Sequence, residues 1–128
     1  MSFEGFELIY SYSRKQAIED GVLIDVTDQA NETGFKVPVA ISDHLYNGYI
    51  VPPDGLDCEG QSISGRLHDV LLMTFYAAKV RWDGERVYFE VLFLMGEGPR
   101  FEKVQCVAVV GPGDEGEPVL TICLPEDE

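Results

Sequence analysis

Three runs in the C-terminal half of the chain place hydrophobic residues at alternating positions, which is the pattern of strands in a half-buried β-sheet. The runs cover residues 86–95 (RVYFEVLFLM), 103–110 (KVQCVAVV) and 118–124 (PVLTICL). The segments between them are short and rich in glycine and acidic residues, as tight turns are. Consecutive strands joined by such turns form an antiparallel meander, and its hydrophobic face must be covered by another layer.

The segment before these runs carries the hydrophobic pattern of a helix over residues 65–79. Its apolar stripe follows the i, i+3, i+4, i+7 spacing of one face: Leu67, Val70, Leu71, Thr74, Phe75 and Ala78. Leu72, Met73 and Tyr76 widen the stripe, so we expect this helix to be covered on more than one side. The sequence therefore predicts an α+β fold: an antiparallel sheet (C-terminal three-stranded meander plus N-terminal strands) packed against one main helix, with short N-terminal helices.

The N-terminal third of the chain is expected to add short helices and two strands. Helices are predicted at residues 14–20 and 28–33, a helical turn at 43–49, a buried strand at 22–26 and a second strand at 37–41. Ser13 and Thr27 are the expected caps of the two helices. Gly21 and Gly34 are expected to end them, because glycine adopts the left-handed backbone of a C-cap. Pro38 lacks an N–H, so it should lie at the start of the second strand or on an edge.

Two loop segments raise the question of a ligand site. Residues 51–65 form the only long loop by composition, and such loops are often functional. The insert GPGDEGEP (residues 111–118) is rich in glycine, but a phosphate-binding loop precedes a helix and carries a basic residue, whereas here a strand follows and no base is present. Its acids also lack the spacing of a calcium loop. We therefore predict that this insert is a hairpin turn.

The chain is strongly acidic. Nine basic and 23 acidic residues give a formal net charge of −14, and the excess of acids is spread over both halves. Such a field disfavours direct binding to nucleic acid and to anionic membranes, and it attracts basic proteins and metal ions. The alternative interpretation is that the acidity only keeps the protein soluble.

Length and cysteine usage indicate a simple cytoplasmic domain. The 128 residues fit a single domain, expected to cover 1–128. Cys58, Cys106 and Cys123 are odd in number and include no C-x-x-C pair, which argues against a disulfide framework or a zinc site. The first residues do not resemble a signal peptide, and the longest apolar runs are too short to span a bilayer. We expect a cytoplasmic protein with no membrane contact, no metal and no cofactor.

Asp25, Arg66 and His68 are the candidates for a catalytic role. Asp25 ends a predicted strand, where carboxylates form acid–base and metal sites but also ordinary helix caps. Arg66 could clamp the carboxylate of a ligand or of the chain's own C-terminal PEDE segment, and we prefer the internal pair. His68 adjoins Asp69, but neighbours at i+1 on a helix point in different directions. His44 and His68 are better interpreted as solvated or structural residues, because no nucleophile and base pair is apparent.

A sparse basic group surrounds the end of the main helix and the first two strands of the meander. It consists of Lys79, Arg81, Arg86, Arg100 and Lys103, with Trp82 and Tyr88 interleaved. Neighbouring acids dilute this pattern, so it does not favour binding to RNA or DNA.

Three stretches carry a resemblance to a known family: YSRKQAIEDGVLIDVTDQANETGFKVPVAIS, GRLHDVLLM and GPGDEGEPVLTICLPEDE. In their order and spacing the chain resembles a family of uncharacterised bacterial proteins, often encoded on plasmids, phages and other mobile elements. That family is a domain of unknown function, so the resemblance implies no catalytic or binding residues. It implies only a small protein carried by a mobile element.

The leading functional hypothesis is a non-enzymatic protein-interaction module that uses an acidic surface to bind a basic host protein. The expected interaction surface comprises Asp114, Glu115, Glu117, Glu126 and Asp127. The alternative is a small enzyme or ligand-binding domain with a site near Asp25, Arg66 and the loop at 51–65.

Overall fold

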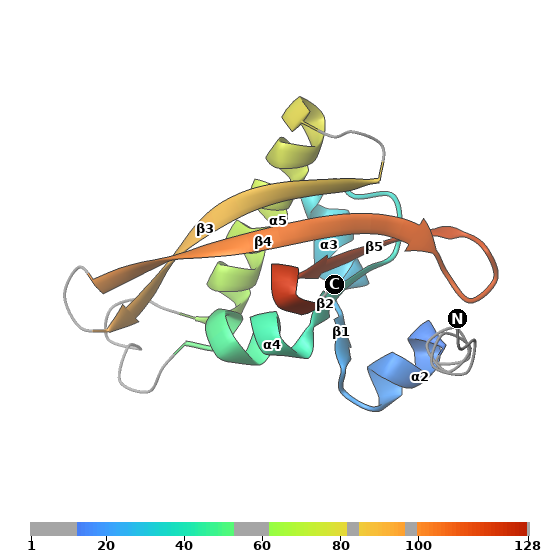
Figure 1. Cartoon of the computed structure of the whole chain (residues 1–128), viewed down its shortest axis with the longest axis horizontal. Helices are drawn as coiled ribbons and strands as arrows, with labels where there is room; N and C mark the ends of the chain where they lie inside the picture. Colours follow the sequence, from blue (N-terminus) through green and yellow to red (C-terminus); the bar gives the residue numbers. More distant parts are fainter. Residues whose placement is uncertain (1–12, 53–61, 82–84, 97–99, 128) are drawn as a thin grey trace, which may run out of the picture.

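The fold is a five-stranded sheet with its long helix on one face (Figure 1). The computed structural model describes residues 13–52, 62–81, 85–96 and 100–127. In chain order the elements are α2 (Arg14–Glu19), β1 (Leu23–Asp25), α3 (Thr27–Thr33), β2 (Val39–Ser42), α4 (Asp43–Leu45), the π-helical turn η1 (Tyr46–Ile50), α5 (Ile63–Arg81), β3 (Arg86–Gly96), β4 (Arg100–Pro112), β5 (Pro118–Cys123) and the 3-10 turn η3 (Pro125–Asp127). The predicted α+β fold is confirmed.

The strand order is β1-β2-β5-β4-β3. The predicted meander is present, because β4 runs antiparallel to both β3 and β5. β2 pairs with β5 in parallel, whereas β1 and β2 are antiparallel, so the complete sheet is mixed. All four residues of β2 are buried, and Pro38 immediately precedes this strand as predicted. The glycine-rich insert forms the turn between β4 and β5, where Gly116 has a φ of +83°.

The main core lies between the sheet and α5. Leu67, Val70, Leu71 and Thr74 are buried as the helical stripe predicts. They meet the inward-facing residues of the meander, which include Val87, Phe89, Val91, Phe93, Val104, Cys106 and Ala108. The expectation that α5 is covered on more than one side is confirmed in part: α3 and η1 also contact the helix, with the ring centres of Phe35 and Phe75 5.5 Å apart, whereas Met73 and Tyr76 are 43% and 56% exposed. The helix thus packs on the sheet, α3 and η1, and leaves the side that carries Met73 and Tyr76 open.

Three local predictions need correction. β1 is a half-buried edge strand of three residues rather than a buried one. Thr27 does not cap α3: Asp25 accepts hydrogen bonds from the backbone N–H and the hydroxyl of Thr27, at 3.1 and 2.5 Å. The loop predicted at 51–65 ends earlier, because α5 already begins at Ile63, and its residues 53–61 lie outside the described part of the chain.

Candidate functional site

The residues predicted for an enzymatic site lie at opposite edges of the sheet. Asp25 ends β1 at one edge, and its carboxylate accepts hydrogen bonds from Thr27 at the start of α3. Arg66 contacts β3 at the other edge through the carbonyl of Leu94. Four strand spacings of about 4.8 Å separate these edges by roughly 19 Å. The two side chains therefore cannot act on one small substrate.

Arg66 is a buried connector between backbone segments, with only 4% of its surface exposed. Its Nη1 donates to the carbonyl of Tyr49 at 2.7 Å and its Nη2 to the carbonyl of Leu94, while its guanidinium lies 5.7 Å from the centre of the Phe93 ring. Burial lowers the pKa of Arg66. The described hydrogen bonds join Arg66 to η1 and β3, and Glu128 of the PEDE segment, which the sequence suggested as its partner, lies outside the described residues.

His68 and the buried cysteines offer little chemistry. His68 is exposed on α5. Cys106 and Cys123 are free thiols and buried. Burial, with a smaller contribution from the charge of Cys123, raises the pKa of Cys106 to about 12, so its thiolate is scarcely populated near neutral pH.

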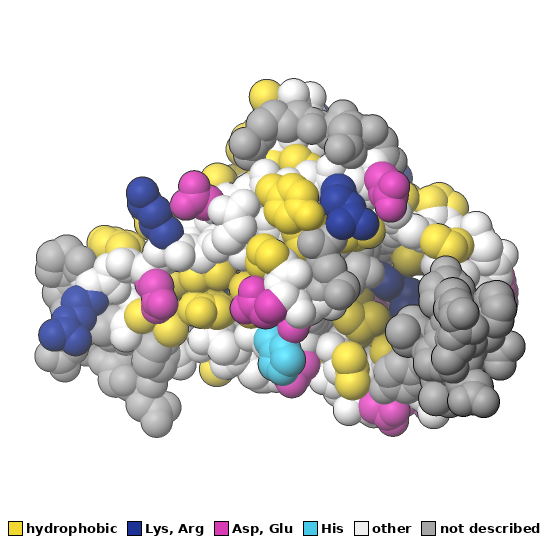
Figure 2. All heavy atoms as spheres, in the orientation of Figure 1, with side chains coloured by type: hydrophobic (Ala, Val, Ile, Leu, Met, Phe, Trp, Pro, Cys, Tyr) yellow, Lys and Arg dark blue, Asp and Glu magenta, His cyan; other side chains and the backbone are white. Residues whose placement is uncertain are grey.

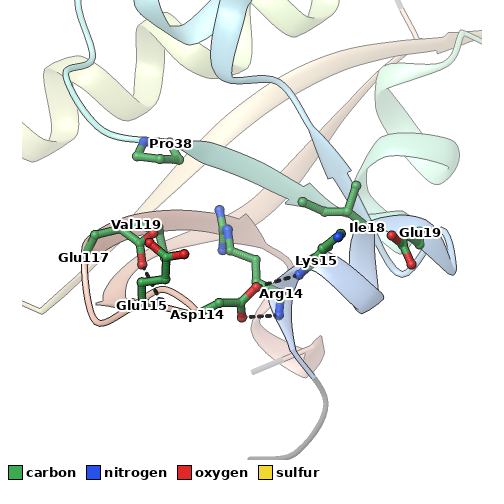
Figure 3. Close-up of a pocket in the computed structure, with 9 residues that line it drawn as sticks. All are labelled: Arg14, Lys15, Ile18, Glu19, Pro38, Asp114, Glu115, Glu117 and Val119. Carbon is green, nitrogen blue, oxygen red and sulfur yellow. Dashed lines mark hydrogen bonds between the residues drawn. The ribbon is translucent and has the colours of Figure 1, made fainter.

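The tip of the β4–β5 hairpin holds α2 in place. Asp114 accepts from the backbone N–H groups of Arg14 and Lys15 at 2.7 and 3.0 Å (Figure 3). Ser13 accepts from the backbone N–H of Gln16 at 3.0 Å. Two of the exposed N–H groups at the start of α2 are thereby satisfied from a distant part of the chain. Asp114 was predicted to belong to an interaction surface, but its carboxylate already accepts two hydrogen bonds from the backbone of α2.

Arg14 fastens the same helix to β5. Its guanidinium donates to the hydroxyl of Thr121 and to the carbonyl of Leu120, both at 2.9 Å. Burial lowers the pKa of Arg14, an effect that the nearby charges of Asp25, Asp114 and Glu117 oppose. These acids and the two hydrogen bonds offset the positive charge of Arg14, so the guanidinium is poorly placed to hold an anionic ligand.

Two hollows flank this contact. One, of about 370 Å³, lies between α2, Pro38 and the hairpin tip (Figure 3). The other, of about 830 Å³, is lined by α2, β1 and the β4–β5 hairpin, and Val109, Val119 and Leu23 contribute to its apolar wall. We call the larger one the α2 groove. Its volume lies in the range of small-molecule sites.

The C-terminal turn carries a second polar cluster. Asp127 accepts from the hydroxyl of Ser42 at 3.0 Å, and its other oxygen lies 2.6 Å from Nδ1 of His44. This hydrogen bond, together with the charge of Asp127, raises the pKa of His44 above its ordinary value of 6.5. Ser42 is also the N-cap of α4, so the cluster joins η3 to α4. The carboxylate of Asp127 is therefore also engaged in hydrogen bonds within the molecule. Glu115 and Glu126, by contrast, are exposed.

The sheet face opposite α5 exposes hydrophobic side chains along β3 and β4. Tyr88, Leu92 and Phe101 are 42%, 59% and 60% exposed, and the ladder register places all three on this face. Figure 2 shows hydrophobic and charged side chains interspersed over these strands. Towards β5 the same face is covered, since Val107 and Cys123 are buried. We call the exposed part, with Arg86, Glu90 and Lys103, the outer face.

Sequence reasoning missed this surface, although the signal was present. The even-numbered positions of β3 include Tyr88 and Leu92, so the strand is hydrophobic on both sides apart from Arg86 and Glu90. The predicted basic group divides: Arg86 and Lys103 lie on the outer face, whereas Nζ of Lys79 lies 4.5 Å from the centre of the Phe75 ring on α5. Trp82 lies outside the described residues.

Within the described parts of the chain, no group of three or more His, Cys, Asp or Glu side chains could hold a metal ion. None of the described helices is long and apolar enough to cross a membrane.

A family model, described as a family of unknown function (DUF6573), matches residues 1–128. The chain belongs to this family. No curated protein and no solved structure matches the chain significantly. The resemblance stated from the sequence therefore holds at the level of a family of unknown function, and membership of DUF6573 assigns no role to the α2 groove, the His44 cluster or the outer face.

Proposed function

We propose that this DUF6573 protein is a non-enzymatic interaction module that binds a basic partner protein through the outer face. The exposure of Tyr88, Leu92 and Phe101 on one sheet face is the observation that carries the proposal. Isolated hydrophobic residues are normal on a protein surface, but aromatic and aliphatic side chains gathered on one face favour a protein contact.

Charge and resemblance specify the partner further. A net charge of −14 favours association with a basic protein and accelerates it by long-range attraction. The resemblance to proteins of bacterial mobile elements favours a host protein as the partner and the cytoplasm as the compartment. The exposed Glu115 and Glu126 stay in the proposal as peripheral contacts that guide the approach.

The test compares two double variants in the capture of basic proteins from a bacterial lysate. Leu92→Ser with Phe101→Ser alters the outer face, whereas Met73→Ser with Tyr76→Ser removes similarly exposed side chains from the open side of α5. We expect the first pair alone to abolish capture. We also expect capture to weaken between about 50 and 500 mM salt, since the Debye length falls from roughly 14 to 4 Å. The proposal would be contradicted if both double variants lost capture equally, or if capture did not change with salt concentration.

A small enzyme or ligand-binding domain is the second candidate. The size of the α2 groove and its polar rim, which includes Arg14 and Thr121, favour it over the location first suggested by Asp25, Arg66 and the 51–65 loop. A screen of small amines and neutral polar compounds by thermal shift tests this candidate. A true ligand must stabilise the wild type and lose its effect when Val119→Trp fills the groove.

A further inference from the structure

β3 is an unusually long strand at the edge of the sheet. Among the described strands it pairs with β4 alone, and it runs from Arg86 to Gly96 over 11 residues. The opposite edge, β1, has only three residues. Proteins commonly protect edge strands by shortening them or by placing proline or lysine in them, because an open edge can pair with another chain. β1 follows this rule and β3, which contains neither residue, does not.

The hydrogen-bond pattern identifies the backbone groups that face the open edge. The N–H of Val110 donates to the carbonyl of Glu85, which makes this a hydrogen-bonded pair of the β3–β4 ladder. In an antiparallel ladder such pairs alternate, so the odd-numbered residues of β3 bond to β4 and the even-numbered ones point away. Glu90 and Leu92 therefore direct their N–H and C=O groups to the open side.

Arg66 marks where the open edge ends. The carbonyl of Leu94 points the same way as that of Leu92, and it accepts a hydrogen bond from the Arg66 guanidinium. Next to it lies a small hollow of about 110 Å³, lined by residues that include Asp69, Leu92 and Phe101. The protein thus terminates its own edge at Leu94, and the outward backbone groups just before it are those of Leu92 and Glu90.

We propose that β3 receives an extended strand from a basic partner, which adds to the sheet alongside Glu90 and Leu92. This inference rests on the proposed function and names the surface and the backbone conformation of the partner. Strand addition supplies main-chain hydrogen bonds, and side-chain contacts supply specificity. Lys103 lies opposite Leu92 on β4, but the charged residues next to the open edge, Glu90 and Asp69, are acidic and exposed. A segment that alternates lysine or arginine with apolar residues is complementary to these two acids. A second copy of the chain is disfavoured, because it would bring two net charges of −14 together.

A short fluorescent peptide that alternates lysine and valine is the probe. We expect it to bind the wild type and to slow hydrogen exchange at the amides of Glu90 and Leu92. Leu92→Pro should weaken binding by at least about tenfold relative to Leu92→Ala, because both remove the side chain and only proline removes the outward N–H. The ladder to β4 does not use that N–H, so folding should persist. The same peptide with N-methylated valines tests the main-chain bonds on the unchanged protein, and it should not bind.

Several outcomes would overturn the inference. They are no binding of the lysine–valine peptide, equal binding of its N-methylated form, protection of amides elsewhere than in β3, or a wild-type dimer that Leu92→Pro dissociates. The proposed function fails separately, if the outer-face variants still capture basic proteins as the wild type does. A partner that needs Phe101 but tolerates Leu92→Pro would overturn strand addition and leave the interaction module standing.

Discussion

At the scale of single residues, the polar side chains that most resemble site residues hold the fold together. Arg66 supplies donors to two carbonyls from separate elements, and Asp25 supplies an acceptor to the first turn of α3. Such roles depend on burial and on partners far along the chain. A sequence pattern identifies the residue types but not these partners.

Replacing Arg66 should cost much more stability than replacing His68. Arg66→Leu leaves two carbonyl acceptors without their donor, at about 1–3 kcal/mol each, so we expect a loss of about 2–6 kcal/mol in the free energy of unfolding. His68→Ala changes an exposed side chain and should stay within about 0.5 kcal/mol. Urea titrations measure both. A similar cost for the two variants would mean that the hydrogen bonds of Arg66 contribute nothing to stability.

The His44–Asp127 pair should make stability depend on pH in a defined direction. The folded pKa of His44 is raised above 6.5, so the pair stabilises the fold fully below that pH and loses its effect as the pH rises through the folded pKa. The difference in melting temperature between the wild type and His44→Gln should therefore be larger at about pH 5.5 than at about pH 8.5. His68→Gln is the control at another exposed histidine, and the same pH dependence there would contradict the prediction.

At the scale of elements, the short pieces owe their position to contacts distant in sequence. α2 has six residues, too few to be stable as an isolated helix. Asp114 and Arg14 attach it to the β4–β5 hairpin, at a separation of 100 residues between the two bonded groups. We expect α2 to detach before the rest of the molecule unfolds.

Asp114→Ala should destabilise α2 specifically. Loss of a capping carboxylate costs about 0.5–2 kcal/mol, and amide hydrogen exchange in α2 should accelerate while exchange in β4 stays slow. Glu115→Ala is the matched control, because this neighbouring acid is exposed and its side chain has no such role. Equal acceleration in the two variants would show that Asp114 is not the cap.

The elements that could be predicted from the sequence are those with local signals. The alternation in β3, β4 and β5, the stripe of α5 and the Ser13 cap each depend on neighbours within a few residues, and all are present. The parallel pairing of β2 with β5 and the docking of Asp114 on α2 join distant segments, so no local pattern encodes them. Asp25 and Arg66 were predicted as candidates for a shared site from residue type and position alone, whereas their separation in the fold depends on this long-range topology.

At the scale of the whole molecule, the acidic charge opposes self-association through the exposed parts of β3. The charge of −14 disappears near the isoelectric point of about 4.3, and repulsion between copies disappears with it. A hydrophobic outer face beside an open strand edge then favours assembly.

Light scattering should therefore rise sharply as the pH approaches about 4.3. Leu92→Lys should suppress this assembly more than Met73→Lys, although both add the same charge at an exposed hydrophobic position. Only the first change places a charge on β3. Identical scattering curves for the two variants would mean that assembly near the isoelectric point does not use this strand.

The parallel pairing of β2 with β5 also sets the order in which the chain can fold during synthesis. β5 lies between β2 and β4, so β1 and β2 have no place in the sheet until the ribosome has made α5, β3, β4 and then β5. α5 and the β3–β4 hairpin can associate earlier, because they are consecutive. Until β5 is synthesised, β1 and β2 cannot pair with the rest of the sheet. Insertion of β5 between β2 and β4 then completes the sheet, and this step is slow because it joins segments far apart in sequence.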